Sequence, residues 1–239
     1  PEAHKLAMGG YEGRGVEIIK NEMDCEKGFN EDAVLEKLVT IKKEISIIIA
    51  VGEDDKNAIY PPVEMIFNQD LNQLEYQLSP AILDEKILWK AEAIALAVVK
   101  NLKSPGIFAV ELFLDIDNNV FVNETAPRVH NSGHHTIEAA FSSQFDMLWR
   151  VILNYPLGKT KPIMNAAMIN LIGEAGYNGQ AKYQGLEEVL EIDNLFVHIY
   201  GKKETRPGRK MGHITVLSNE RQQLIHIANK ARQLVKVIS

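Results

Sequence analysis

The sequence predicts an α+β fold, with helices and strands mixed along its 239 residues. Three observations support this prediction. Residues 44–51, "EISIIIAV", are rich in β-branched side chains, which favours a strand. Residues 84–102 repeat apolar side chains at helical spacing behind a possible Asp84 cap, which predicts an amphipathic helix. From residue 163 onward the pattern is mostly strands and turns, until a final helix from about Ser218.

The first part of the chain predicts strands around a glycine-rich loop. Residues 9–15, "GGYEGRG", contain four glycines and lie before a predicted strand at 16–19, and a further strand is predicted at 33–39. The loop lacks the Gly-Lys-Ser/Thr ending of a Walker A motif, and no helix follows it, so a dinucleotide fingerprint is also excluded. Such a loop can still cover phosphates with its backbone N–H groups, or it can be a simple flexible turn.

Turn-rich sequence near residue 160 predicts a division of the chain. A helix is expected over roughly 143–154, ended by Pro156 and Gly158. The segment "YPLGKTKP" that follows is charged and turn-rich. We therefore expect one region over 1–160 and a small β-rich C-terminal domain over 161–239 that ends in a helix.

Composition excludes several classes of protein. Hydrophobic residues make up 46% and charged residues 24% of the chain, as in ordinary globular proteins. The formal net charge of −6 argues against a general nucleic-acid binder, and no apolar run is long enough to span a membrane. A single cysteine, Cys25, excludes an internal disulfide and a cysteine-based zinc site. This cysteine usage fits a reducing compartment, and we expect a cytoplasmic protein.

Two strands around an Asp/Asn turn predict a pair of facing carboxylates. If the turn of "GIFAVELFLDIDNNVFVNE" is Ile116–Asn119, then Asp115 pairs with Val120, Phe113 with Val122, and Glu111 with Glu124. The two glutamates would lie about 4.5–5.5 Å apart at Cβ. Facing carboxylates either share a proton or hold a cation, and an all-oxygen site favours magnesium. A five-residue turn would shift the register and leave two solvated glutamates instead.

The histidine-rich stretch "VHNSGHHT" predicts a substrate loop better than a zinc site. His130 and His134 are four residues apart, but Ser-Gly between them favours a loop over a helix. No cysteine or carboxylate lies at ligand spacing, so zinc on these histidines is disfavoured. Asn131, Ser132 and Gly133 are instead expected to donate hydrogen bonds to a polar substrate.

A cationic turn lies near the C-terminus. The segment "YGKKETRPGRKMGH" over 200–213 places its cations around a Pro-Gly turn; they are Lys202, Lys203, Arg206, Arg209 and Lys210. In an acidic chain this turn is a local positive site, and arginine forks fit phosphate groups. A solvated surface turn is the other interpretation of the same charges.

Several of these blocks occur together in one known family. The segments "GGYEGRG", "VLEKLV", "KEISIII", "YPPVE", "GIFAVELFL", "FVNETAPRVHNSGHHT" and "RPGRKMGH" have its order and spacing. The chain resembles, over essentially its whole length, the 5-(carboxyamino)imidazole ribonucleotide synthases of the ATP-grasp superfamily. The resemblance implies a partial ATP-grasp fold, with ATP between two α+β subdomains. It also implies that the family's N-terminal α/β domain, and the first part of the central domain, are missing from this sequence.

The resemblance implies a role for individual residues. It assigns ATP binding to Lys5, Gly9, Gly10, Tyr11, Gly13, Gly15, Glu36, Lys37, Val39, Glu44 and Asn123, and magnesium binding to Glu111 and Glu124. It assigns ribonucleotide binding to Tyr11, Arg14, Asn131, Ser132, Lys202, Arg206, Arg209 and Lys210. Catalytic roles fall to Glu12, Arg14 and Lys202. The family loop usually has aspartate where this chain has Glu12, so the carboxylate lies one methylene further out.

The expected activity follows from the same resemblance. It is carboxylation of the amine of 5-aminoimidazole ribonucleotide through carboxyphosphate, using ATP and bicarbonate, in de novo purine biosynthesis. We expect these small-molecule substrates, a homodimer, and neither a nucleic-acid nor a membrane partner. Two alternatives stay open: another ATP-grasp carboxylate–amine ligase, or a non-catalytic fragment of such an enzyme.

Overall fold

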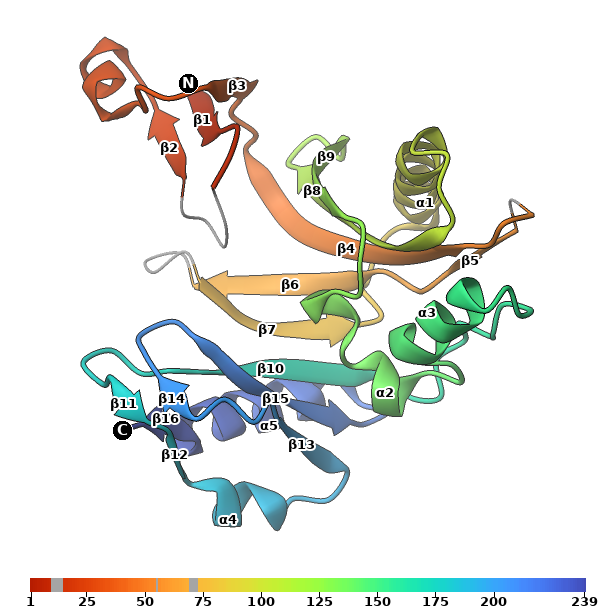
Figure 1. The fold of residues 1–239 in the computed structure, drawn as a ribbon, viewed down its shortest axis with the longest axis vertical. Coiled ribbons are helices and arrows are strands. Elements are labelled where there is room, and N and C mark those ends of the chain that lie inside the picture. The colour runs from red at the N-terminus through yellow and green to blue at the C-terminus, as the bar shows by residue number, and fades with distance from the viewer. Residues whose placement is uncertain (10–14, 55, 69–72) are drawn as a thin grey trace.

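A small antiparallel sheet occupies one end of the molecule in the computed structural model, which describes residues 1–9, 15–54, 56–68 and 73–239 (Figure 1). Its strand order is β2-β1-β3, and a 3₁₀ helix, η1, lies between β2 and β3. The bounds are β1 Glu2–Leu6, β2 Val16–Ile19, η1 Glu22–Lys27 and β3 Ala33–Lys37. The predicted strands at 16–19 and 33–39 are thus confirmed, the second ending two residues early.

One long antiparallel sheet forms the rest of the scaffold, with the order β13-β15-β10-β7-β6-β4-β8-β9 and β5 paired to β4. Its strands are β4 Ile41–Val51, β5 Asn57–Ile59, β6 Val63–Asn68, β7 Gln73–Ser79, β8 Gly106–Asp115, β9 Val120–Ala126, β10 Ala166–Ile172, β13 Leu195–Ile199 and β15 Lys210–Leu217. Strand β10 pairs with β7, so the sheet continues across residue 160. The division of the chain at that residue stays a prediction.

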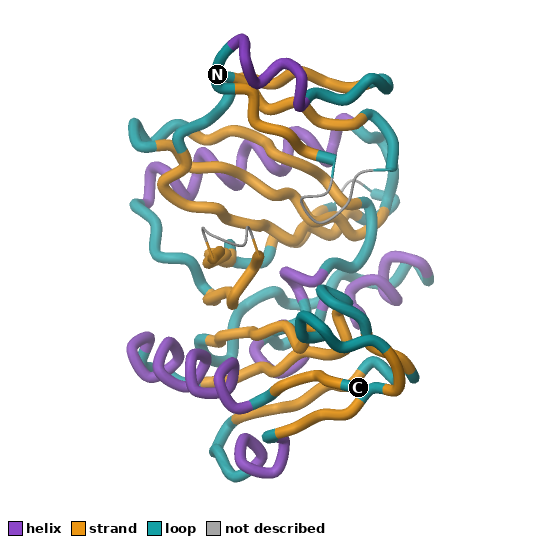
Figure 2. Tube along the Cα trace, turned by 90° about the vertical axis from the view of Figure 1, so that its left-hand side faces the viewer, coloured by secondary structure: helices purple, strands orange, loops and turns teal. Residues whose placement is uncertain are grey.

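The helices lie on both faces of this sheet (Figures 1 and 2). They are α1 Glu85–Asn101, η2 Asn131–Gly133, α2 Thr136–Ala139, α3 Gln144–Ile152, α4 Leu186–Leu190 and α5 Arg221–Leu234. Helix α3 begins close to the predicted residue 143. Ser143 caps its N-terminus, because its hydroxyl accepts from the backbone N–H of Asp146. None of the helices in the described part of the chain is long and apolar enough to cross a membrane.

The predicted α+β class is confirmed, with small differences at the C-terminal end. The final helix starts at Arg221 rather than near Ser218, and the short strand β16 follows it. Helix α4 was not predicted, since five residues are too few to show a helical period. The remaining short strands are β11 Gly179–Gln180, β12 Lys182–Gln184, β14 Glu204–Thr205 and β16 Lys236–Ile238.

Strands β4 and β8 present different chemistry on their two faces. One face is apolar along its length: Ile45, Ile47 and Ile49 pack with β8 side chains against α1. The other face begins apolar under α3, where Ile48 and Ala50 are buried. Further along, the same face becomes polar at Ser46 and Glu44. The change from apolar to polar on one sheet face sets the position of the candidate site.

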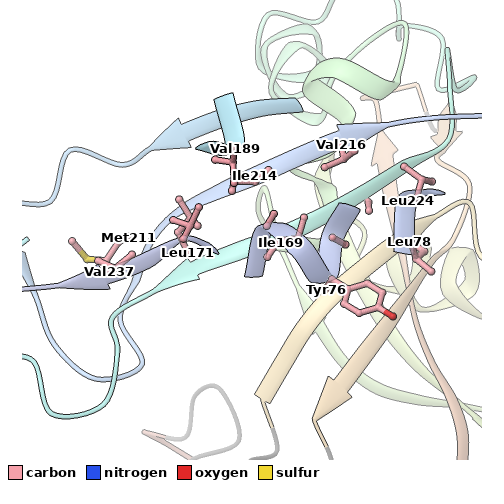
Figure 3. Packing of buried hydrophobic residues seen from close by; sticks show 14 residues of the cluster. Tyr76, Leu78, Ile169, Leu171, Val189, Met211, Ile214, Val216, Leu224 and Val237 are labelled. Carbon is pink, nitrogen blue, oxygen red and sulfur yellow. The ribbon is translucent and has the colours of Figure 1, made fainter. Parts of the chain in front are cut away.

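A separate core joins the parts of the chain before and after residue 160. Leu78 from β7 belongs to the same buried cluster as Ile169 of β10, Ile214 of β15 and Leu224 of α5 (Figure 3). Leu78 is only 1% exposed. The hydrophobic effect therefore holds α5 against strands from both regions.

Candidate functional site

The two predicted carboxylates face each other across the β8–β9 hairpin. Glu111 and Glu124 are direct Cα partners, as predicted. The neighbouring register is not as predicted, because Leu112 pairs with Val122 and Leu114 with Val120. The two errors cancel: a bulge at Asn123 shifts the register by one residue before Glu111 is reached.

The turn explains the first register error. It spans Asp115 to Asn119, with the backbone N–H of Asp115 bonded to the carbonyl of Asn119 at 3.0 Å. The Asp115 carboxylate also accepts from the backbone N–H groups of Asp117 and Asn119. Asn118 adopts the left-handed conformation with φ 62°, which asparagine tolerates better than most residues. The loop is therefore one residue longer than the predicted turn, and the Asn123 bulge compensates for it.

The bulged residue also connects the hairpin to the N-terminal sheet. Lys5 Nζ donates to Asn123 Oδ1 at 3.0 Å and lies 2.7 Å from Glu36 Oε2. These three residues come from β9, β1 and β3, and all three were assigned to ATP binding. The structure brings them together into one charged cluster beside the carboxylate pair.

Glu111 is a buried acid in an unfavourable position for negative charge. Its side chain is 15% exposed, and burial raises its pKa to about 7, with the nearby Glu124 and Glu44 adding to the rise. Burial likewise raises the pKa of Glu44 to about 7. Ser46 is the β4 partner of Glu111, so Ser46, Glu111 and Glu124 form a row across three strands. A cation beside this row would favour the ionised carboxylates.

His130 lies against the carboxylate pair. Its Nε2 atom is 3.8 Å from Glu111 Oε1, which is longer than a hydrogen bond. Burial lowers the pKa of His130 to about 4, so we interpret the contact as a neutral imidazole beside a carboxyl group and not as an ion pair. Ligand atoms of Glu111, Glu124 and His130 lie within 4.8 Å of one another. Within the described ranges no other group of this kind occurs, so the structure shows no ligand set made from His130 and His134.

The loop carrying these histidines is clamped at its start by α3. Gln144 is fully buried; its Oε1 accepts from the backbone N–H of His130 at 2.9 Å, and its Nε2 donates to the His130 carbonyl at 2.8 Å. The same Nε2 lies 2.9 Å from His134 Nδ1. A Cβ at Gly133 would lie 2.5 Å from Gln144 Oε1, so only glycine allows this close approach. The start of the loop is therefore tied to α3 by hydrogen bonds on both sides of the His130 peptide.

Further along, the loop contacts β7 and β10, which lie beyond β6 from β4 in the sheet order. Asn131 exchanges two hydrogen bonds with Asn170 of β10, at 2.8 and 3.1 Å. Gln77 of β7 donates to the Ser132 carbonyl at 2.8 Å. The Asn131 side chain is thus already engaged by protein, and it can reach a substrate only with its remaining hydrogen-bonding capacity.

A stack of histidines continues this contact. The rings of His134 and His213 have centroids 4.9 Å apart, and those of His213 and His198 are stacked at 4.4 Å. His198 Nε2 lies 2.6 Å from Glu138 Oε1. Because His213 and His198 are register partners on β15 and β13, the loop is bound to the sheet as far as its edge strand.

Ser132 is buried beside His130. It was predicted to bind a ribonucleotide, and in this structure it is 1% exposed, so that role stays a prediction. Its hydroxyl lies 2.8 Å from Ser46 Oγ and 3.0 Å from His130 Nδ1. The hydroxyl is enclosed by protein beside the His130 imidazole.

The cationic turn reaches the same region through its lysines. The Lys210 charge opposes the rise in the pKa of Glu111 and contributes to the low pKa of His130, which places Lys210 near both. Lys202 Nζ donates to the Lys210 carbonyl and lies 5.6 Å from the centre of the Tyr200 ring. The turn therefore adds positive charge to a site that carries several carboxylates.

The arginines of the turn lie further out. Arg209 Nη1 donates to the Glu204 carbonyl at 2.8 Å. Arg206 is exposed, and its carbonyl accepts from the backbone N–H of Arg209. Ribonucleotide binding by Arg206 and Arg209 stays a prediction.

Comparison with known proteins identifies the nucleotide-binding part. Residues 1–145, more than half of the chain, match the ATP-grasp domain family. The chain belongs to the ATP-grasp family. Residues 166–227 of this ATP-grasp protein match a second family, the phosphoribosylaminoimidazole carboxylase C-terminal domain. The family resemblance predicted from the sequence blocks is confirmed.

Several relatives resemble this ATP-grasp protein in sequence and fold. It is 34% identical to N5-carboxyaminoimidazole ribonucleotide synthase of Bacillus subtilis, covering 96% of this chain and 60% of the relative. The crystal structure of N5-carboxyaminoimidazole ribonucleotide synthetase from Thermotoga maritima is 44% identical, with a TM-score of 0.91 over 100% of this chain and 63% of that one. The chain thus spans about three fifths of these relatives.

A third relative is described with bound ligands. It is N5-carboxyaminoimidazole synthase from Aspergillus clavatus, in complex with ADP and 5-aminoimidazole ribonucleotide. Its sequence is 28% identical, and the TM-score is 0.85 over 98% of this chain and 62% of that one. The fold of this ATP-grasp protein is therefore the fold of a solved ligand complex.

Part of the predicted nucleotide site lies outside the described residues. This holds for Gly10, Tyr11, Glu12, Gly13 and Arg14. At the two ends of that loop, Gly9 and Gly15 have φ of +82° and +86°, a conformation that favours glycine. Lys37 ends β3, and Val39 lies in the connection to β4, where an adenine-binding hinge was predicted.

Sequence reasoning missed four residues that shape the site. Ser46, Gln77, Asn170 and His213 are buried or half-buried polar residues within strands, and all contact the loop at 130–138. Ser46 left a visible signal, because it interrupts the apolar run "ISIII" two residues after Glu44. His213 ends the family block "RPGRKMGH", but its contact with the loop was not predicted. Gln77 and Asn170 left no signal, since their partners are distant in sequence.

Proposed function

We propose that the whole protein to which this ATP-grasp chain belongs carboxylates 5-aminoimidazole ribonucleotide, using ATP and bicarbonate, in purine biosynthesis. One observation carries the proposal: the carboxylate pair faces His130 of the loop at 130–138, and the same loop contacts β10 and β15, the strand in which the cationic turn ends. The names of the relatives and the ligands of the Aspergillus clavatus structure support this choice of substrates.

The nucleotide would lie between the N-terminal sheet and the carboxylate pair. We propose that Lys5, which contacts Glu36 and Asn123, binds phosphate oxygens of the nucleotide. Two facing carboxylates with a neighbouring amide oxygen suit magnesium. The raised pKa of Glu111 supports this, because two buried carboxylates are unfavourable when both are charged, and a bound cation would offset that charge. We therefore propose that Glu111 and Glu124 hold magnesium, which when bound offsets charge on the ATP phosphates.

The reaction divides into two transfers. A bicarbonate oxygen attacks the γ-phosphorus of ATP, and ADP leaves with the electrons of the broken bond, which forms carboxyphosphate. Carboxyphosphate then breaks into carbon dioxide and phosphate, and the amine of the ribonucleotide attacks the carbon and loses a proton. We assign Lys202 and Arg209 to the ribonucleotide phosphate, Lys210 to charge balance beside Glu111, Glu12 to the proton transfer and Arg14 to ribonucleotide binding.

Arg209→Ala tests the ribonucleotide assignment. We expect the KM for 5-aminoimidazole ribonucleotide to rise about tenfold or more with little change in kcat, because an anchoring charge acts equally on ground and transition states. Coupled measurement of ADP release checks this. Arg232→Ala is the matched control, since Arg232 pairs with Glu75 and lies on α5, outside the turn. A pure loss of kcat would contradict the anchoring role.

ADP release, together with thermal unfolding, separates the proposed function from the two alternatives, another ATP-grasp ligase and a non-catalytic fragment. Equal ADP release with other amine acceptors would indicate a different ATP-grasp ligase. A magnesium-ATP-dependent rise in Tm without ADP release would indicate a chain that binds but does not turn over nucleotide.

We also propose a homodimer formed through α3. This helix and its flanks expose large apolar side chains, including Phe141, Phe145, Trp149 and Ile152. Trp149→Glu is expected to shift the sedimentation coefficient from dimer to monomer, whereas Trp89→Glu on α1, with the same 62% exposure, should not. A monomeric parent protein, or equal effects of the two variants, would contradict this interface. A cytoplasmic location is proposed from the single cysteine.

A further inference from the structure

His130 is connected to the interior by a chain of two serine hydroxyls. Its Nδ1 atom faces Ser132 Oγ at 3.0 Å, and Ser132 Oγ faces Ser46 Oγ at 2.8 Å. Both serines are 1% exposed, so water does not compete for these bonds. The opposite nitrogen, Nε2, points to Glu111 Oε1. The imidazole therefore has one nitrogen toward the serines and one toward the carboxylate pair.

The backbone decides the direction of this chain. The Ser132 N–H donates to His130 Nδ1 at 3.4 Å, which makes Nδ1 an acceptor at the start of η2. A nitrogen that accepts from a backbone N–H carries no proton of its own. The two hydroxyls then donate in one direction: Ser46 donates to Ser132, and Ser132 donates to Nδ1. The single proton of the neutral ring is left on Nε2.

We propose that Ser132, supported by Ser46, is a positioning residue that fixes His130 in the Nε2–H tautomer. The imidazole then presents a proton, and not a lone pair, to Glu111 and Glu124. Although the three side chains lie within 4.8 Å of one another, this tautomer removes His130 from the ligand set. The remaining oxygen ligands suit a hard cation, so the two serines select magnesium over zinc and other nitrogen-seeking metals. This last step rests on the proposed magnesium site.

The proton position is directly measurable in the protein without ATP, ribonucleotide or metal. In protein labelled with ¹⁵N-histidine at pH 8, we expect His130 Nε2 to resonate as the protonated nitrogen and Nδ1 as the unprotonated one. Ser132→Ala should bring the two shifts together, because one of the two donors to Nδ1 is lost. Ser46→Ala should act in the same direction with a smaller change.

Thr215→Val is the matched control. Thr215 is fully buried on β15, and its hydroxyl has no hydrogen-bond partner in the part of the chain that the structure describes. Its replacement should leave the His130 shifts unchanged, and backbone amide spectra report that each variant is folded. An Nδ1–H tautomer in the parent protein, or unchanged shifts in folded Ser132→Ala, would overturn the proposal.

Zinc binding tests the selectivity. Zinc on Nε2 requires the ring proton to move to Nδ1, so zinc affinity at His130 should rise as the tautomer preference falls. For Ser132→Ala we expect a rise of about tenfold, equivalent to one hydrogen bond. The His130 resonances report zinc binding in both proteins. If the parent protein and Ser132→Ala bind zinc at the same concentration, the proposed selectivity is overturned. The NMR result stands or falls independently of carboxylation, because neither substrate is present.

Discussion

Glu111→Gln is expected to lower the rate of ADP formation by at least about a hundredfold while raising the Tm of the ligand-free protein. The loss of rate follows from the loss of one of two facing carboxylates, which removes roughly 3 kcal/mol of transition-state stabilisation. The amide keeps the shape of the side chain, so the hairpin should stay intact. Steady-state ADP release at saturating magnesium measures the first effect.

The gain in stability follows from the raised pKa of Glu111. Burial and neighbouring carboxylates raise it from 4.5 to about 7. The folded state therefore prefers the neutral acid, so the stability contributed by this group is complete below pH 4.5 and lost as the pH rises through 7. At pH 8 the charged form costs at most about 3 kcal/mol, a figure that solvent access to the site reduces. Glutamine is neutral throughout and avoids this cost.

Thermal unfolding at two pH values checks whether Glu111→Gln raises the Tm, as expected from the raised pKa of Glu111. The Tm difference between variant and parent should be clear at pH 8 and small at pH 5. Magnesium should raise the Tm of the parent more than that of the variant, because it binds the folded carboxylates. Glu191→Gln, at an exposed position beyond α4, is the control and should change neither quantity. Normal ADP release by Glu111→Gln would argue against the metal assignment.

Leu78→Ala is expected to destabilise the whole chain by about 3 kcal/mol, within the range of about 2–5 kcal/mol for a buried leucine. Leu78 is 1% exposed and packs in the cluster that includes Ile169 and Leu224, so its removal leaves a cavity between β7, β10 and α5. Urea unfolding followed by fluorescence and by circular dichroism measures the loss. We expect both probes to shift together, because this core spans residue 160.

Leu190→Ala is the matched control for the core substitution. Leu190 ends α4 and is 62% exposed, so its truncation should change stability by less than about 0.5 kcal/mol. Two separate transitions, with only one shifted by Leu78→Ala, would contradict a shared core. That outcome would favour the predicted independent domains over 1–160 and 161–239.

Local patterns were sufficient for most individual elements. The β-branched run at 44–51 became part of β4, and the helical spacing at 84–102 became α1. Both depend on neighbours within a few residues, and a periodic sequence records them directly. The pairing of β7 with β10 was not predictable in this way, because it joins strands separated by about ninety residues of chain and depends on packing around α5.

The candidate site likewise combines features that local patterns predicted with features that they did not. Alternation along β8 and β9 placed Glu111 and Glu124 on one face, but the actual turn and bulge were not predicted. The burial of the Ser132 hydroxyl between Ser46 and His130 was not predicted either. No local pattern records that Ser46 lies under a loop more than eighty residues away.

By itself the sequence determined which side chains share a face of each strand, where the long helices lie to within a few residues, and which family blocks are present. These are properties of short segments, so they follow from backbone geometry and nearest neighbours. Only the tertiary structure decided that the loop at 130–138 crosses the sheet from Ser46 to His198. Its hydrogen bonds form between distant segments, and burial then fixes the protonation of groups such as Glu111.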